Sequence, residues 1–300
     1  MLQPLVSLLG RGFKFYDFLY LKQISRGVQK VCCEHPSAFY IWYRQLNIRS
    51  GIMLETYHTH VQRLLQTITE KEAGALKEAG RLAAEAIENG GILHCFGAGH
   101  SHMIGEELFY RAGGLAPVKP HWVQELLLES GGARASEWER DEGFAVKTAQ
   151  NLDLEKHDVL LVASTSGRNP APVEAALAAR EKNIPVIALT SSLYEGASRH
   201  SSGKKLKDVG TVVIDTHVPS GDAALTDDNV PVPFAAVSSM AALFAAQAVS
   251  AEATARLGRM KGGAPVFLSG NIDGSDAWNR KLIDRYKKRI PALAGEEEIR

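Results

Sequence analysis

The most constraining feature of this sequence is a series of short apolar runs, each followed by a turn and then by a helix-like segment. In the first, the run 92–96 ends at Gly97 and Gly99, and a helical pattern follows. In the second, the run 159–163 ends at a turn rich in serine and threonine. Unbroken apolar runs of this length are typical of strands buried on both faces. Strands that alternate with helices predict βαβ units, and therefore a parallel sheet with helices on both faces.

The same alternation continues along the chain from residue 53. Strands are predicted at 92–96, 115–121, 159–163, 183–190, 209–215 and 266–268. Helices are predicted from 53, and at 72–87, 103–111, 143–151, 170–181, 233–257 and 275–288, with an irregular segment at 124–143. The sequence therefore predicts an α/β domain with two leading helices, which either cap the sheet or supply a dimer surface.

Residues 1–52 differ from the rest of the chain. They hold many of the aromatic residues, the adjacent Cys32 and Cys33 and mostly basic charge, and their periodicity is poor. The apolar stretch 5–9 is too short for a secretory signal, and no cleavage site follows it. Our hypothesis is that 1–52 is an atypical extension, either disordered or the product of a mis-assigned start, with Met53 as the natural start. Residues 53–293 then form one domain and 294–300 a tail.

Composition argues against several classes of protein. The 34 basic and 34 acidic residues cancel, so charge gives no reason to expect nucleic acid or an anionic membrane surface as a partner. No apolar run approaches the roughly 18–20 residues of a membrane span. The three cysteines lack metal-ligand spacing. We therefore expect a cytoplasmic protein without a metal or an organic cofactor.

The turns after the apolar runs are the place to look for a ligand, because ligands of parallel sheets bind beyond the carboxyl ends of the strands. A dinucleotide fingerprint fails, since His102 stands where the third glycine should be. A nucleotide-binding P-loop fails because no Gly-Lys-Ser or Gly-Lys-Thr follows either turn. Free amides at a helix start and serine or threonine hydroxyls can instead hold a phosphate. The alternative is that these serines only cap helices.

Two motifs resemble the sugar isomerase (SIS) domain. They are G-x-G-x-S at 97–101 and S-x-S-G at 164–167, and the resemblance covers about 53–293. The runs FGAGHSHMIGEELFYRAGG, STSGRNP, SRHSSGKKL and SGNIDGSDAWNRKL are similar to bacterial SIS-domain proteins related to phosphoheptose isomerases. The resemblance implies a three-layer αβα sandwich around a five-stranded parallel sheet, doubly wound as in flavodoxin. It also implies a homodimer or homotetramer that binds a phosphosugar.

The resemblance assigns the phosphate to residues of both turns. The family's phosphate-binding hydroxyls carry over to Ser101, Ser164, Thr165 and Ser166. The full predicted phosphate set also includes the loop residues Gly99, His100 and Asn169. Many family members have threonine where this chain has Asn169, so Asn169 either contacts the phosphate or only caps the following helix.

Acid–base chemistry needs carboxylates or imidazoles beside these turns. The predicted catalytic residues are His102, Glu106 and Glu139. Further candidates are His100, Glu107, Glu137 and Glu142 near the turns, and Asp222, His200 and His217 in later loops. The alternatives are a Glu107–Arg111 ion pair, a solvated face for 137–142, and a hydrogen-bonded core position for His94. Residues 271–276 match a calcium loop only in part, so capping by Ser275 or Asp276 is favoured.

The predicted function is binding of a sugar phosphate or amino-sugar phosphate as the substrate of an isomerase or a related lyase or elimination reaction. One alternative is a non-catalytic sensor of sugar phosphates, because the same fold can serve either role. Another is a structural assembly protein in which the helix 233–257 drives oligomerisation.

Overall fold

The computed structural model describes residues 53–260 and 262–294. Residues 1–52 lie outside the described part of the chain, so the hypothesis about them stays a prediction. The α/β unit begins at Tyr57. The elements are α4 Met53–Lys71, α5 Ala73–Glu88, β1 Leu93–Gly97, η2 Gly99–His102, α6 Met103–Leu108, β2 Val118–Pro120, η3 Gln124–Leu126, η4 Leu128–Ser130, α7 Gly132–Arg140, α8 Glu142–Gln150, β3 Val159–Ala163, α9 Pro170–Glu181, β4 Val186–Thr190, α10 Leu206–Val209, β5 Val212–Asp215, β6 Ala223–Asp227, β7 Val230–Ala236, α11 Ser238–Leu257, α12 Ser275–Tyr286 and η5 Pro291–Leu293.

The centre of the α/β unit is a five-stranded sheet with the order β2-β1-β3-β4-β5. Every neighbouring pair in it is parallel. All residues of β1, β3 and β4 are buried, as continuous apolar runs predict for a sheet covered on both faces. The predicted α/β class and the five-stranded parallel sheet are therefore confirmed.

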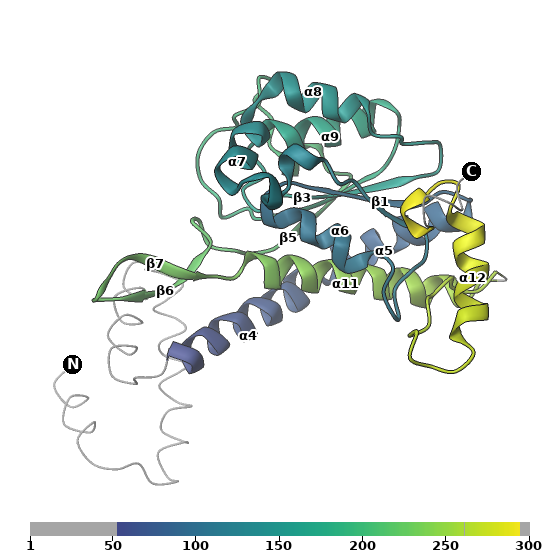
Figure 1. Ribbon diagram of the computed structural model, residues 1–300. Helices are drawn as coiled ribbons and strands as arrows, with labels where there is room; N and C mark the ends of the chain where they lie inside the picture. Colours follow the sequence, from purple (N-terminus) through teal and green to yellow (C-terminus); the bar gives the residue numbers. More distant parts are fainter. Residues whose placement is uncertain (1–52, 261, 295–300) are drawn as a thin grey trace, which may run out of the picture. The chain divides into compact units, whose positions relative to one another are not determined.

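Helices cover both faces of this sheet (Figure 1). Side chains from α5, α6 and α11 form one core cluster with Leu93, Leu161 and Leu189 of the sheet. Side chains from α8, α9 and α10 form the second, with Phe96 and Val162 on the opposite face. The result is the predicted three-layer sandwich.

Small residues allow the helices of the first face to pack closely. Helix α11 buries five alanines, among them Ala245 and Ala246. At Gly80 of α5, a Cβ atom would lie 2.5 Å from Cβ of Glu252 on α11. A larger residue at this position would force the two helices apart.

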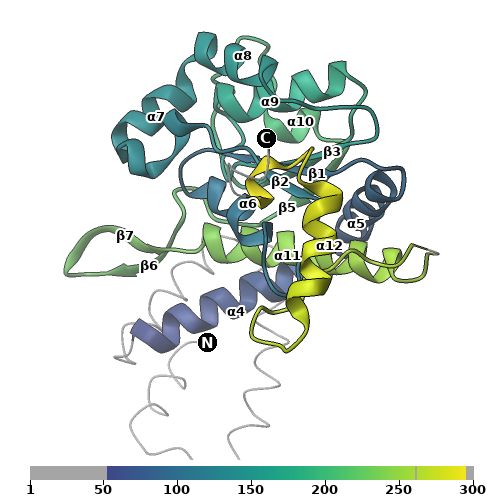
Figure 2. The same cartoon turned by 45° about the vertical axis from the view of Figure 1, so that its right-hand side comes forward.

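A third core cluster closes the end of the sheet where β1 begins. It groups Ile92 with Phe267 and with Leu282, Ile283 and Tyr286 of α12. Figure 2 shows α12 in yellow across this region. The loops that follow β1, β3, β4 and β5 lie at the opposite end of the sheet, where the carboxyl ends of the strands meet.

The structure corrects several predicted boundaries. A helix was expected from residue 233, but 230–236 form β7, which pairs with β6 in an antiparallel hairpin, and α11 begins at Ser238. Apolar composition alone does not separate a short strand from a buried helix. The strand expected at 266–268 is only an isolated bridge between Leu115 and Val266. The strand expected from 209 begins at Val212, because 206–209 form α10.

Two local predictions were also wrong. The segment expected to be irregular contains α7, where Ala135 is buried and the Trp138 ring lies 4.8 Å from that of Phe144. Gly274, with φ of 81°, stands at the N-cap of α12, and no side chain caps that helix. Ser275 and Asp276 therefore lie within its first turn instead of capping it.

Candidate functional site

Strand register brings the two predicted phosphate loops together. Gly97, the last residue of β1, is the direct partner of Ala163, the last residue of β3. The chain therefore leaves the sheet at neighbouring points, about 4.8 Å apart, and enters residues 98–102 on one side and 164–169 on the other. These are the two segments that the sequence assigned to one anion.

The first loop turns tightly over its own strand. A Cβ atom on Gly97 would lie 2.4 Å from the Ser101 carbonyl oxygen, so only glycine allows this approach. The Ser101 amide donates to the Ala98 carbonyl at 3.0 Å, and the residue is half-buried while His100 is exposed. The loop therefore has one covered and one open polar side chain.

His102 is part of the support of this loop. It is buried, and its Nδ1 lies 2.5 Å from the Gly99 carbonyl oxygen. Its Nε2 lies 3.4 Å from a carboxylate oxygen of Glu106. Because the carbonyl can only accept, Nδ1 carries a proton in this arrangement. His102 fixes the turn, and a catalytic role for it or for Glu106 stays a prediction.

The second loop also depends on a glycine. Gly167 has φ of 59°, and a Cβ atom there would lie 2.5 Å from the Thr190 hydroxyl. Its amide donates to the buried Ser164 hydroxyl at 3.2 Å. Thr165 and Ser166 are half-buried, and their hydroxyls have no hydrogen-bond partner within 53–260 and 262–294. Both hydroxyls are therefore available to a ligand.

Asn169 connects the second loop to two charged side chains. It occupies the N-cap position of α9, as predicted, but its side chain makes no capping hydrogen bond. Its Oδ1 instead accepts from the Arg199 guanidinium at 3.0 Å, and it also hydrogen-bonds the Glu139 carboxyl group. The Asn169 side chain is thus held at the loop and does not cap α9.

Arg168 and Arg199 were missed by the sequence analysis. The Arg199 amide donates to the Arg168 carbonyl at 2.8 Å, and Arg168 Nε donates to the Ala197 carbonyl at 3.0 Å. Burial, and then the positive charge of Arg168, lower the pKa of Arg199. Two guanidinium groups therefore lie next to the serine loop. In a chain without net charge, neither arginine stands out in the sequence.

Glu139 on α7 lies in an environment that raises the pKa of its carboxyl group. Burial raises its pKa, and the hydrogen bond with Asn169 only partly opposes this. A carboxyl group with a raised pKa is closer to the neutral range in which a general base works best. Glu137, two residues earlier on α7, is exposed. The predicted solvated face of 137–142 thus describes Glu137 but not Glu139.

The other predicted side chains have structural partners. Glu107 pairs with Arg111, so the ion-pair alternative is confirmed, and it also accepts from Gln247 at 2.9 Å. Glu142 accepts from Ser201. The Asp222 carboxylate accepts the amides of Val237 and Ser238 at the start of α11.

Two histidines of the later loops are each held by a glutamate. His200 lies 2.7 Å from Glu174. His217, just after β5, lies 2.8 Å from Glu72, and its amide donates to Asp215 at 2.8 Å. Because β5 ends at the same edge as β3, the hydrogen-bonded pair of His217 and Glu72 also lies at this edge of the sheet.

None of the described helices is long and apolar enough to cross a membrane.

A protein-family model described as SIS domain matches residues 56–191. A UPF0309 protein of Halalkalibacterium halodurans is 46% identical over 244 residues, which cover 81% of this chain and 98% of that protein. A UPF0309 protein of Geobacillus kaustophilus is 45% identical over 249 residues, covering 82% of this chain and 99% of that protein.

Similar solved structures include two sugar-phosphate proteins. The phosphoheptose isomerase GmhA from Neisseria gonorrhoeae is 21% identical with a TM-score of 0.44, covering 66% of this chain and 95% of that one. The Vibrio vulnificus NanR protein, complexed with ManNAc-6P, is 17% identical with a TM-score of 0.44, covering 86% of this chain and 75% of that one.

Proposed function

Because this chain belongs to the SIS-domain family, within its UPF0309 group, we propose that it binds a sugar phosphate or amino-sugar phosphate at the carboxyl ends of β1 and β3. We propose further that it acts on this ligand as an isomerase, or by a related lyase or elimination reaction. The pairing of Gly97 with Ala163 is the observation that carries the proposal, since it sets both hydroxyl-bearing loops side by side.

The loops offer the groups that a phosphate needs. The hydroxyls of Ser101, Thr165 and Ser166 can donate to phosphate oxygens, together with loop amides. Arg168 and Arg199 add positive charge beside Asn169. Hydrogen bonds from guanidinium groups to phosphate are roughly twice as strong as neutral ones, so these arginines would contribute much of the affinity.

Glu139 is the proposed proton carrier. For an aldose–ketose conversion, its carboxylate would take the proton from C2, and the C–H electrons would form the C1–C2 double bond of an enediolate. The C1 carbonyl electrons would move onto O1. Return of the proton to C1, with protonation of O1 balanced by loss of the O2 hydroxyl proton as the C2 carbonyl forms, completes the exchange. The Asn169 hydrogen bond would orient the carboxyl group toward a sugar whose phosphate lies in the loop.

The alternative is a non-catalytic sensor that uses the same phosphate site. It shares the predicted ligand and differs only in turnover. We also propose a homodimer or homotetramer in the cytoplasm, and sedimentation analysis of the purified chain tests the assembly.

Binding is tested by thermal shift against hexose, hexosamine, heptose and pentose phosphates. A ligand at one hundred times its dissociation constant should add about 2.7 kcal/mol of apparent stability. The double variant Ser164→Ala, Ser166→Ala should lose most of that gain. Ser269→Ala, in the segment before α12, is the matched control and should keep it. An equal response in both variants would place the phosphate elsewhere.

Catalysis is tested by exchange of the C2 hydrogen with deuterated water, followed by NMR on the best ligand of the panel. The wild type should exchange the hydrogen and form the isomer. Glu139→Gln should bind with similar affinity but lose exchange, whereas Glu137→Gln on the same helix should behave as the wild type. Tight binding without exchange by the wild type would support the sensor instead.

A further inference from the structure

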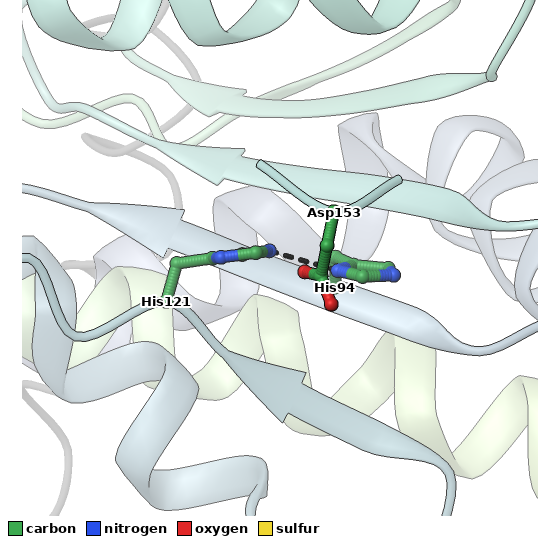
Figure 3. A group of neighbouring side chains, drawn as sticks. All are labelled: His94, His121 and Asp153. Carbon is green, nitrogen blue, oxygen red and sulfur yellow. Dashed lines mark hydrogen bonds between the residues drawn. The ribbon is translucent and has the colours of Figure 1, made fainter. Parts of the chain in front are cut away.

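A second polar cluster brings together residues of β1, of the end of β2 and of the segment before β3. His94 is in the middle of β1, His121 directly follows β2, and Asp153 lies between α8 and β3 (Figure 3). His94 Nδ1 and His121 Nε2 are 2.8 Å apart. One ring nitrogen of each histidine and a carboxylate oxygen of Asp153 all lie within 4.8 Å of one another. Three side chains from distant parts of the sequence therefore bring their ligand atoms close together.

Asp158 fixes the orientation of His94 through the ring nitrogen that does not face His121. Its Nε2 lies 3.0 Å from Asp158 Oδ2, and both side chains are fully buried. Asp158 is itself held by the amides of Ile92 at 2.9 Å and Glu155 at 2.7 Å, and by Arg289 at 2.7 Å. The carboxylate keeps the proton on Nε2, so Nδ1 carries a lone pair, which accepts from His121 Nε2 at 2.8 Å. A carboxylate behind a histidine is the usual outer support of a metal-binding imidazole.

We propose that His94, His121 and Asp153 bind a divalent transition-metal ion, with Zn²⁺ as the best match, and that Asp158 positions His94. Two imidazoles favour a metal of this class over Ca²⁺ or Mg²⁺, which prefer oxygen ligands throughout. Three protein ligands leave a fourth tetrahedral position for water or a ligand. This proposal does not depend on the phosphate site.

The cluster can reach metal-binding distances with small movements. Zn–N bonds of about 2.0–2.1 Å in a tetrahedral site set the two nitrogens roughly 3.3 Å apart, so the imidazoles must separate by about half an ångström. His121 is half-exposed at the end of a strand and Asp153 is exposed, so both can adjust while His94 stays in place. His121 would move its proton from Nε2 to Nδ1.

Lys119 is the group that competes with the metal. Its ammonium pairs with the Asp153 carboxylate and would compensate for that charge when no metal is bound. The ion would have to displace it. Because Asp153 is exposed, this exchange costs little, as for other ion pairs at a protein surface.

The test is direct metal binding by the full chain. The purified protein is stripped with a chelator and titrated with Zn²⁺ by calorimetry and with Co²⁺, whose visible absorption reports imidazole and carboxylate coordination. One ion per chain and a tetrahedral Co²⁺ spectrum are expected. His121→Ala and Asp153→Ala should lose stoichiometric binding, while His58→Ala, an exposed histidine on α4, should keep it. Circular dichroism confirms that each variant is folded.

A positioning role for Asp158 is tested in the same titration. Asp158→Asn should retain the site but weaken Co²⁺ binding by about ten- to a hundredfold. Retention of wild-type affinity by both His121→Ala and Asp153→Ala would overturn the site. So would the absence of stoichiometric binding to the wild type, which would leave the cluster as a hydrogen-bonded chain from Asp158 through His94 to His121.

Discussion

Two polar clusters share strand β1, and they are built on different principles. The serine loops after β1 and β3 depend on backbone shape, because Gly97 and Gly167 permit approaches that no other residue would. The cluster of His94, His121 and Asp153 depends on side chains that three separate segments supply. The loops are therefore sensitive to a single added methyl group. The histidine cluster is sensitive to charge and to the carboxylate behind it.

The largest expected effect concerns the backbone of the serine loops. Gly167→Ala would combine a positive φ with a Cβ 2.5 Å from Thr190. Left-handed strain costs about 1–2 kcal/mol, and overpacking adds about 1–3 kcal/mol. Gly203→Ala has a similar φ of 71° but open space around it, and should lose only the strain. Equal losses in urea unfolding would show that the approach to Thr190 is unimportant.

The second effect concerns Asp158, the carboxylate that supports the histidine cluster, and it depends on pH. Burial alone would raise the pKa of Asp158, but hydrogen bonds from His94 and the amides of Glu155 and Ile92 outweigh it and hold the pKa at about 2. A lowered pKa adds stability above the ordinary value of 3.8, and that stability is lost as pH falls towards 2. The shift corresponds to about 2 kcal/mol.

Urea unfolding of the wild type and of Asp158→Asn at pH values between 5 and about 2 checks this. The difference in unfolding free energy between the two proteins should shrink as pH falls through this window. A difference that stays constant would mean that the neighbours of Asp158 do not lower the pKa of its carboxyl group.

A smaller loss is expected at Ser164. Its hydroxyl accepts the Gly167 amide in a buried position, and removal of a buried acceptor costs about 1–3 kcal/mol. Ser164→Ala should therefore loosen the loop and weaken phosphosugar binding, with unfolding and calorimetry as the measurements. Ser166→Ala should weaken binding without changing stability. The reverse pattern would exchange the roles of the two serines.

The smallest effect is expected at Lys119. Its pair with Asp153, whose side chain is 54% exposed, should contribute less than about 1 kcal/mol to stability. Lys119→Ala should nevertheless strengthen Co²⁺ binding, because it frees the Asp153 carboxylate. Unchanged or weaker binding would contradict competition between the ammonium and the metal.

The same contrast explains what the sequence could predict. Strands β1, β3 and β4 were predictable because apolar runs mark strands buried on both faces. The serine loops were predictable because each lies within a few residues of its strand. In contrast, Arg199 joins the site from 30 residues beyond Asn169, and no local pattern signals that contact.

The histidine cluster could not be predicted from the sequence, for a related reason. His94 was correctly predicted as a hydrogen-bonded core residue. The proximity of His121 and Asp153 to His94, however, results from the parallel pairing of β1 with β2 and from the path of the chain before β3. The hairpin of β6 and β7 was missed because Pro231 and Pro233 argue for a loop or a helix start, although proline is also accepted in edge strands.

The most direct test of the account is a crystal structure with the sugar phosphate that binds best in the panel. The account predicts that the phosphorus lies between residues 98–101 and 164–167, with its oxygens within hydrogen-bond distance of the hydroxyls of Ser101, Thr165 or Ser166. A phosphate bound at any other edge or face of the sheet, with both serine loops empty, would contradict it.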